Sequence, residues 1–298
     1  MNVARHVFRE YDVRGVVGRD LTRDLAHALG RAFASAAWAK AGHAPRIVVG
    51  RDNRPSGVEL SAGFRAGVIA AGGIAVDVGE CPTPALYFAE RTFGADAGAQ
   101  VTGSHNPPEF NGFKMVIGGD AMHGEEIQAL WETIALESWR TGEGHEESDG
   151  SVLRKYRDAI LERHTLLRPV KVVVDCGNGV GALIAVETLR QLGADVVPLF
   201  CESDGTFPNH HPDPTVPENL VDLQAEVRRH GAELGIAFDG DADRIGAVDE
   251  TGRIIFGDQL LVIYGRDAVQ RFGAGSPVIF DVKCSEVLPQ ALAAAGAA

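Results

Sequence analysis

Three aspartates at alternate positions are the residues in this sequence best suited to chemistry. Asp239, Asp241 and Asp243 follow an apolar, strand-like run that begins at Leu234. Carboxylates at this spacing repel one another unless a cation lies between them, and oxygen-only ligands favour a hard ion, Mg²⁺ or Ca²⁺, over zinc. The pattern therefore predicts a divalent-metal site at the end of a buried strand.

Two other kinds of site also contain such an acidic run, the EF-hand calcium loop and the active site of a haloacid-dehalogenase-type phosphatase. In an EF-hand loop Glu250 would be the twelfth residue, but Arg244 occupies the sixth position, where glycine is needed, so the EF-hand is excluded. A phosphatase of the haloacid-dehalogenase type uses the first aspartate after a strand as its nucleophile. It favours Thr or Val where this chain has Asp243, and it stays as an alternative.

The second candidate is the stretch VTGSHNPPEFNGFKM, residues 101–115, which surrounds one hydroxyl, Ser104, with turn-forming residues. It follows AGAQVT, a predicted strand, so Ser104 would lie at a strand's carboxyl end, where open α/β sheets bind ligands. Neighbouring residues of an extended loop point apart, so no simple dyad of Ser104 with His105 is expected. Lys114 is expected to return to the same site.

The two signals together indicate phosphoryl transfer. A phosphorylated serine brings about two negative charges, and beside three aspartates it requires a divalent ion and several cations. Arg14, Lys114 and Arg244 are the candidates for the cations. The chain has no GxxxxGK[ST] motif, which gives an ATP-dependent kinase no support. A phosphoenzyme without a nucleotide donor takes its phosphoryl group from its substrate, which points to a mutase or a phosphatase.

Two further motifs favour structural roles. DCGNGVGA, residues 175–182, lacks the GxGxxG spacing, and its glycines are interpreted as close packing of a helix on a strand. His210 and His211 stand among four prolines, which favours a rigid connecting loop over a metal site.

The elements that would position these residues repeat one plan of strand, turn, Ala-rich helix, glycine and second strand. The plan appears in residues 46–79 and 171–200, and a third copy starts at Pro277 but lacks its last strand. Such units imply parallel pairing with crossover helices. The predicted fold is α/β, with consecutive, topologically similar α/β/α domains, mixed and largely parallel sheets, and a truncated third domain.

The predicted domains are residues 1–150, 151–252 and 253–298, with the polar stretch 140–150 as the first linker. Within the first domain, Ser56 and Glu59 predict a capping box. An apolar stripe at spacing four predicts a core-facing helix: Leu25, Leu29, Phe33 and Ala37.

The bulk composition sets limits on location and partners. A net charge of −13 argues against nucleic acid or an anionic membrane as the main partner. The start of the chain lacks the apolar core of a signal peptide, and no apolar stretch reaches the length of a membrane span. Four scattered cysteines without a CxxC pair indicate reduced thiols, so a cytoplasmic protein is expected.

At this point the chain resembles a known family. TGSHNPPEFNGFKM together with FDGDADR resembles the α-D-phosphohexomutase family, in its bacterial phosphomannomutase/phosphoglucomutase branch. Supporting matches occur in the family's order along the chain: FREYDVRG, VGRDNRPSG, CPTPALYF, VVVDCGNGVG, FPNHHPDPTVPENL and IFDVKCS.

The resemblance implies a reaction and a set of residues. The enzyme would move a phosphoryl group between positions 1 and 6 of mannose or glucose phosphate through a phosphoserine and a hexose 1,6-bisphosphate. One Mg²⁺ ion would be bound by Ser104, Asp239, Asp241 and Asp243. The implied catalytic residues are Ser104, His105, Lys114 and Arg14, and the implied substrate-binding residues are Tyr11, Arg244 and Lys283, with Tyr11, Arg14 and Lys283 in one cleft.

Departures from the family pattern carry their own expectations. Ala242 stands where the family's metal loop usually has glycine, and alanine is disfavoured at positive φ. Family members continue through a third and a fourth domain, so this chain is expected to hold the first two domains and part of the third. It is therefore expected to bind Mg²⁺ but to turn over weakly, and an inactive phosphosugar- or metal-binding fragment is the further alternative.

Overall fold

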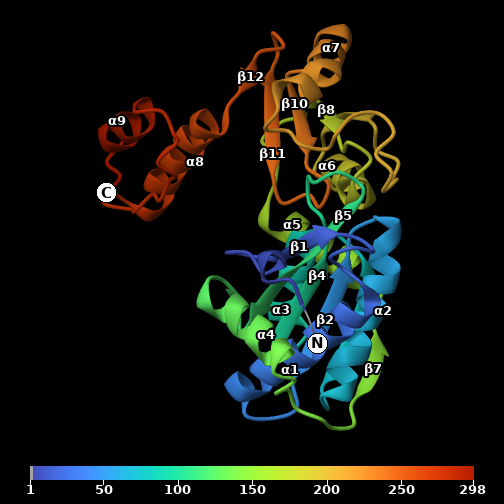
Figure 1. The fold of residues 1–298 in the computed structure, drawn as a ribbon. Coiled ribbons are helices and arrows are strands. Elements are labelled where there is room, and N and C mark those ends of the chain that lie inside the picture. Colours follow the sequence, from blue (N-terminus) through green and yellow to red (C-terminus); the bar gives the residue numbers. More distant parts are fainter. Residues whose placement is uncertain (1–2) are drawn as a thin grey trace.

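A computed structural model describes residues 3–298, which form two successive sheets covered by helices and a C-terminal pair of helices (Figure 1). The first sheet has seven strands in the order β1-β5-β4-β2-β3-β7, with β6 paired to β5. The strands are β1 (Val13–Val16), β2 (Arg46–Arg51), β3 (Ile74–Glu80), β4 (Ala97–Val101), β5 (Phe110–Ile117), β6 (Asp120–Ala121) and β7 (His145–Ser148).

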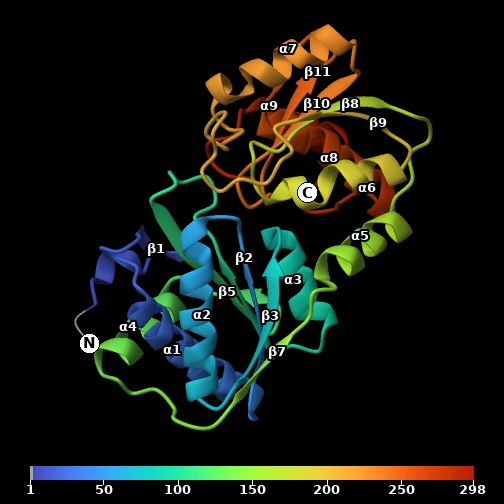
Figure 2. The same ribbon diagram turned by 90° about the vertical axis from the view of Figure 1, so that its right-hand side faces the viewer.

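Parallel ladders join β4, β2, β3 and β7, and β7 lies at the edge of the sheet. Antiparallel β5 joins β4 to β1 at one side. Helices α1 (Arg23–Ala41), α2 (Pro55–Ala70) and α4 (Glu125–Ala135) pack in the core on one face, and α3 (Thr83–Thr92) and α5 (Val152–Arg163) pack in the core on the other. This gives an α/β/α unit, and α5 leads from it to the second unit (Figure 2).

The second sheet has the order β12-β11-β10-β8-β9, with β10, β8 and β9 parallel and β11 and β12 antiparallel. The strands are β8 (Lys171–Asp175), β9 (Asp195–Leu199), β10 (Leu234–Phe238), β11 (Ile245–Asp249) and β12 (Ile254–Ile255). Helix α6 (Ala185–Gln191) covers one face and α7 (Val221–His230) the other. Short 3₁₀ helices are η1 (Arg5–Val7), η2 (Val180–Leu183) and η3 (Pro217–Leu220). The predicted α/β class with mixed sheets is confirmed.

The C-terminal helices α8 (Gly257–Phe272) and α9 (Val287–Ala294) stand apart from both sheets in Figure 1. The strand predicted from Pro277 does not form, and residues 277–282 are coil with Ile279 and Val282 more than 90% exposed. A strand needs a neighbour for its backbone groups, and within residues 3–298 none lies beside this segment. β12 pairs with β11, so the second sheet continues just past the predicted boundary at residue 252.

Of the two local predictions for helices of the first unit, one is confirmed and one is wrong. The stripe of α1 is confirmed, since Leu25, Leu29, Phe33 and Ala37 are all buried. The capping box is wrong, because the N-cap of α2 is Arg54, two residues before Ser56, with Pro55 in the first turn and no side-chain cap. Ser56 instead accepts a hydrogen bond from Asn111.

The linker predicted at residues 140–150 contains a strand. Residues 145–148 pair in parallel with β3 as β7, the edge strand of the first sheet. An edge strand with polar residues on both faces shows no apolar alternation, so the sequence pattern could not reveal it. Among residues 3–298, no helix combines the length and apolar character needed to cross a bilayer.

Candidate active site

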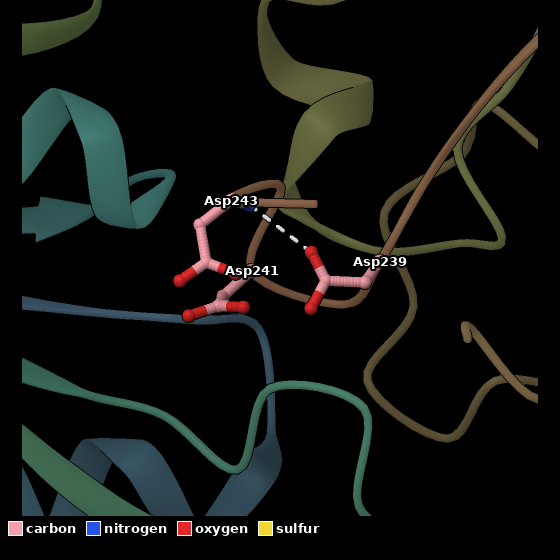
Figure 3. A group of neighbouring side chains, drawn as sticks. All are labelled: Asp239, Asp241 and Asp243. Atoms are coloured by element: carbon pink, nitrogen blue, oxygen red, sulfur yellow. Dashed lines mark hydrogen bonds between the residues drawn. The ribbon is translucent and has the colours of Figure 1, made fainter. Parts of the chain in front are cut away.

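The metal loop, residues 239–244, connects β10 to the antiparallel β11. Asp239 and Asp241 are fully buried and Asp243 is exposed, and one oxygen of each carboxylate lies within 4.8 Å of the others. Figure 3 shows the three side chains gathered on one side of the loop. Asp239 Oδ1 accepts the backbone N–H groups of Asp243 and Arg244, each at 3.0 Å, so the loop is folded around its own first carboxylate.

The charge of this cluster is only partly balanced. Burial, followed by the charges of Asp241 and Asp243, raises the pKa of Asp239 to about 8. Burial also pushes the pKa of Asp241 upward, but the charge and hydrogen bond of Lys114 outweigh it and hold that pKa below its ordinary value. Asp241 Oδ1 is buried and has no hydrogen-bond partner among the described residues. A hard cation is the group that such an oxygen set accommodates.

Lys114 reaches the metal loop from β5, as the sequence predicted. Its Nζ lies 2.7 Å from Asp241 Oδ2 and 2.5 Å from Asp243 Oδ2. Burial lowers the pKa of Lys114, but the two carboxylates outweigh it and raise that pKa above its ordinary value. Lys114 is therefore a permanent positive charge in the site. Thr83, at the start of α3, donates a second hydrogen bond to Asp241 Oδ2 at 2.5 Å.

Ser104 lies in the serine loop, residues 102–109, between β4 and β5. Its side chain is buried, and its Oγ donates to Asp239 Oδ2 at 2.8 Å, which joins the first unit to the second. Its φ is +50°, a left-handed conformation that costs a non-glycine residue energy. That conformation also explains a correction. His105 Nδ1 lies 3.2 Å from Ser104 Oγ, whereas an extended loop would point the two side chains apart.

The serine loop is held by a residue that the sequence analysis missed. Arg54, at the end of the turn after β2, is completely buried. Its guanidinium donates to the carbonyl oxygens of Ser104, Asn106, Pro107 and Phe110 at 2.6–3.0 Å. One side chain thus fixes four carbonyl groups around the hydroxyl.

Asp52 completes this support from the same turn. Its carboxylate accepts hydrogen bonds from Arg54 Nε, from the Thr102 hydroxyl and from the Gly103 N–H. Thr102 Oγ1 in turn accepts the Ser104 N–H at 2.8 Å. Burial raises the pKa of Asp52, and Arg54 opposes that shift. The pair is a buried ion pair, and most of its other hydrogen bonds go to the serine loop.

A cleft of about 690 Å³ opens beside the metal loop. Four predicted site residues line it, Tyr11, Arg14, Lys114 and Arg244, together with Asp243. Arg14 donates to Asn106 Oδ1 at 2.6 Å and to Asp12, and its buried Nε has no partner among the described residues. Arg244 Nη1 lies 3.5 Å from His105 Nε2. Burial, and then the charge of Arg244, lowers the pKa of His105.

Lys283 lies away from this group. It lines a different cleft, between the start of α8 and the segment before α9, together with Thr215 and Phe256. The expectation that Tyr11, Arg14 and Lys283 share one cleft is therefore wrong for this structure. Lys283 lies between α8 and α9 in the sequence, and it is far from the cleft because these two helices stand apart from the first unit (Figure 1).

The histidine motif has a structural partner. His210 Nε2 lies 3.0 Å from Asp175 Oδ2 at the end of β8, and Asp175 is fully buried. Within residues 3–298, neither His210 nor His211 belongs to a cluster of three possible metal ligands. The glycines of DCGNGVGA serve a close approach to the metal loop, since a Cβ on Gly179 would lie 2.7 Å from the Gly240 carbonyl oxygen.

Arg54, Asp52 and Thr83 are the site residues that sequence reasoning left out. All three follow strands of the first sheet, β2 and β3, that run parallel to β4 and end at the same edge. The carboxyl ends of parallel strands meet where α/β sheets bind ligands. A search for polar residues after each predicted strand would have found them.

Comparison with protein families gives two matches. The models of phosphoglucomutase/phosphomannomutase α/β/α domain I and domain II match residues 5–140 and 154–252. A phosphomannomutase/phosphoglucomutase from Pseudomonas aeruginosa is 47% identical over 282 residues, which are 95% of this chain and 60% of that protein. A phosphoglucomutase from Neisseria gonorrhoeae is 44% identical over 292 residues, 96% of this chain and 62% of that protein.

A solved structure resembles the whole described fold. The crystal structure of a phosphoglucomutase/phosphomannomutase family protein from Burkholderia thailandensis superposes with a TM-score of 0.94 at 42% identity. The match covers 99% of this chain and 66% of that chain. This chain thus spans about 60% of the length of the curated relatives that it matches.

Proposed function

The chain belongs to the phosphoglucomutase/phosphomannomutase family, and on that premise we propose that it carries the phosphoryl-transfer centre of a hexose phosphate mutase. Ser104 carries the phosphoryl group and passes it to a hexose 1- or 6-phosphate, which becomes a 1,6-bisphosphate. The return of the other phosphoryl group to Ser104 completes the isomerisation. The observation that carries the proposal is the 2.8 Å contact of Ser104 Oγ with Asp239 Oδ2, which joins a nucleophile and a metal loop from two units.

The ion we propose is one Mg²⁺, held by Asp239, Asp241, Asp243 and a phosphoserine oxygen. The oxygen-only donors and the unpartnered Asp241 Oδ1 support it. When bound, the ion supplies positive charge that lowers the repulsion between the aspartates and the phosphoryl group. Lys114 adds a fixed charge from the other side of Asp241.

The remaining residues of the cleft bind the sugar phosphate and orient it. Arg14 has a buried Nε without a partner, which suits an anionic group of the substrate. We assign Tyr11 and Arg244 to the sugar phosphate, because both line the cleft beside Lys114. Lys283 lines the other cleft, and its role in substrate binding stays a prediction.

His105 is the proposed proton carrier. Its lowered pKa keeps the imidazole neutral near pH 7, so a ring nitrogen can take a proton from the attacking sugar hydroxyl. As the new P–O bond to the sugar forms, the bond to Ser104 Oγ breaks, and the same proton can pass to that oxygen. His105 Nδ1, at 3.2 Å from Oγ, lies within reach of it.

Mannose or glucose phosphate is the proposed substrate, glucose or mannose 1,6-bisphosphate the activator, and the cytoplasm the proposed location. The domains are proposed as residues 1–150, 151–252 and 253–298. The family matches to residues 5–140 and 154–252 support the first two.

The test is peptide mass spectrometry of the chain before and after incubation with glucose 1,6-bisphosphate and Mg²⁺. We expect a phosphoryl group on the peptide that contains Ser104, stable to hydroxylamine, and none in Ser104→Ala. Ser56→Ala, a serine of the same unit outside the loop, is the matched control and should leave the labelling of Ser104 unchanged.

The same experiment separates the alternative chemistry. An aspartyl-nucleophile phosphatase would place a hydroxylamine-sensitive phosphoryl group on the peptide that contains Asp239, and Asp239→Asn would abolish it while Ser104→Ala would not. A phosphosugar- or metal-binding module would bind the bisphosphate without any covalent label. Either result overturns the proposal.

A further inference from the structure

Two of the four cysteines lie against each other, although 25 residues separate them in the sequence. The sulfur atoms of Cys176 and Cys201 are 3.3 Å apart. They follow the neighbouring parallel strands β8 and β9, and Cys176 N donates to the Leu199 carbonyl oxygen at 3.2 Å. Both side chains belong to the apolar layer under α6. The two strand ends therefore hold the thiols in contact.

The two thiols differ in access and in acidity. Cys176 is fully buried, whereas Cys201 is partly exposed and precedes an exposed turn. The contact with Cys176 lowers the pKa of Cys201, while the same contact and burial raise that of Cys176. The accessible thiol, Cys201, is thus the one that ionises more readily. Cys201 can therefore react first with an external disulfide, and the buried Cys176 can react second.

We propose that Cys176 and Cys201 form a modification site in which a low-molecular-weight disulfide, such as glutathione disulfide, converts the two thiols to an intramolecular disulfide bond. The sulfur atoms are already in contact, so the bond needs only a small adjustment of the side chains. The inference concerns a site in the second unit and does not depend on phosphoryl transfer at Ser104.

The exchange balances in two steps. The Cys201 thiolate attacks one sulfur of the small disulfide, which breaks its S–S bond, forms a mixed disulfide and releases one small thiolate. Cys176 loses its proton and attacks the Cys201 sulfur, and the second small thiolate leaves. Two protein thiols are oxidised, one small disulfide is reduced, and the two small thiolates take up the two protons.

The bond would fix a segment that contacts the first unit. Next to Cys201, the Glu202 carbonyl accepts from Asn178 Nδ2, and Asn53 of the first unit donates to the Asn178 carbonyl and the Ser203 hydroxyl. A cross-link at this point restricts the unfolded chain and the strand ends together. Oxidation should therefore raise the thermal midpoint by a few degrees.

The test uses the 298-residue chain with Cys284→Ser, which removes the partly exposed cysteine of the C-terminal segment. Burial raises the pKa of Cys81 to about 12, so this thiol should not react and serves as an internal standard. After incubation with glutathione disulfide, the protein is acid-quenched, unfolded, labelled with maleimide and weighed. We expect maleimide on three thiols before oxidation and on Cys81 alone afterwards, with a Cys176–Cys201 peptide in the digest.

Single variants in the same background decide between mechanisms. Cys176→Ala should stop at a mixed disulfide on Cys201, and Cys201→Ala should leave Cys176 unmodified. If a variant fails to fold, the corresponding change to Ser replaces it. The rise in thermal midpoint should disappear in both variants and on addition of dithiothreitol. Three maleimide labels after oxidation, or a mixed disulfide that persists on Cys201 with Cys176 present, would overturn the proposal.

Discussion

The serine loop and the metal loop both place a non-glycine residue in the left-handed region, and they are held there by different means. Ser104 has a φ of +50° and Ala242 a φ of +56°. The serine loop is fixed from outside by the guanidinium of Arg54. The metal loop is folded around its own Asp239, which accepts two backbone N–H groups of the loop.

This difference predicts which substitutions should disturb the conformation of each loop. A loop fixed by one buried cation loses its support at a single substitution, and the charge left behind is costly. The metal loop is folded mainly around its own carboxylate, and its outside donors come from different elements, such as the N–H groups of Thr83 and Val180, so no single substitution removes its support. The serine loop should therefore respond strongly to a change outside it, and the metal loop should respond only moderately.

The largest effect is expected for Arg54→Met. This change leaves Asp52 buried without its cation and removes the guanidinium donors of four carbonyl groups, so the free energy of unfolding should fall by about 4 kcal/mol. Phosphorylation of Ser104 should be lost at temperatures where the variant is still folded. The Mg²⁺ affinity of the unphosphorylated variant should differ little from that of the unphosphorylated wild type, because the three aspartates are unchanged. Urea unfolding, peptide mass spectrometry and calorimetric titration measure the three quantities.

Arg51→Met is the matched control, three residues earlier, at the end of β2. Arg51 pairs with Glu80 at 2.9 Å, and both side chains are partly exposed. Such a pair contributes less than about 1 kcal/mol. If Arg54→Met cost no more than Arg51→Met, or kept the phosphorylated serine, external support of the serine loop would be refuted.

The same contrast explains which site residues the sequence could predict. The three aspartates of the metal loop lie within one short segment, so they and their spacing are visible in the sequence. The clamp on the serine loop comes from Arg54, 50 residues before Ser104, and no local pattern joins the two. The contact of His105 with Ser104 depends on the positive φ of Ser104. The sequence could not predict this φ, because serine rarely adopts that conformation.

Fold predictions divided in a similar way. The stripe of α1 and the units 46–79 and 171–200 are set by local apolar periodicity, and they were predicted. β7 exists only because β3 offers an edge, and residues 277–282 stay coil because no strand lies beside them. Periodicity describes a segment, whereas strand formation depends also on its neighbour.

A smaller effect is expected where the metal loop does receive outside support. Pro212 lies so close to Gly240 that a Cβ added there would be 3.5 Å from its Cγ, and His210 joins this segment to the buried Asp175. His210→Gln should lower the free energy of unfolding by about 2 kcal/mol at pH 6. Burial lowers the pKa of His210, but Asp175 outweighs burial and raises it. The stabilisation is therefore complete below the ordinary value of about 6.5 and is lost as pH rises through the folded-state pKa.

The comparison of wild type and variant should accordingly show a larger difference at pH 6 than at pH 9. Denaturant unfolding at both pH values measures it. His123→Gln changes a mostly exposed ring and should alter the free energy of unfolding by less than about 0.5 kcal/mol. A larger difference at pH 9 would show that the His210–Asp175 pair is not the source of the stabilisation.

The smallest effect is expected for Ala242→Gly. Relief of the left-handed strain favours the glycine variant by about 1–2 kcal/mol, and the greater freedom of glycine in the unfolded chain removes about 0.5–1 kcal/mol of that gain. The net change should be a rise of about 0.5 kcal/mol, measured by denaturant unfolding. Ala39→Gly, on the exposed side of α1, should instead lose about 1 kcal/mol. The opposite signs isolate the backbone conformation. A loss at Ala242 would mean that its methyl group, which lines an apolar cavity with Gly181 and Phe238, stabilises the metal loop more than its φ strains it.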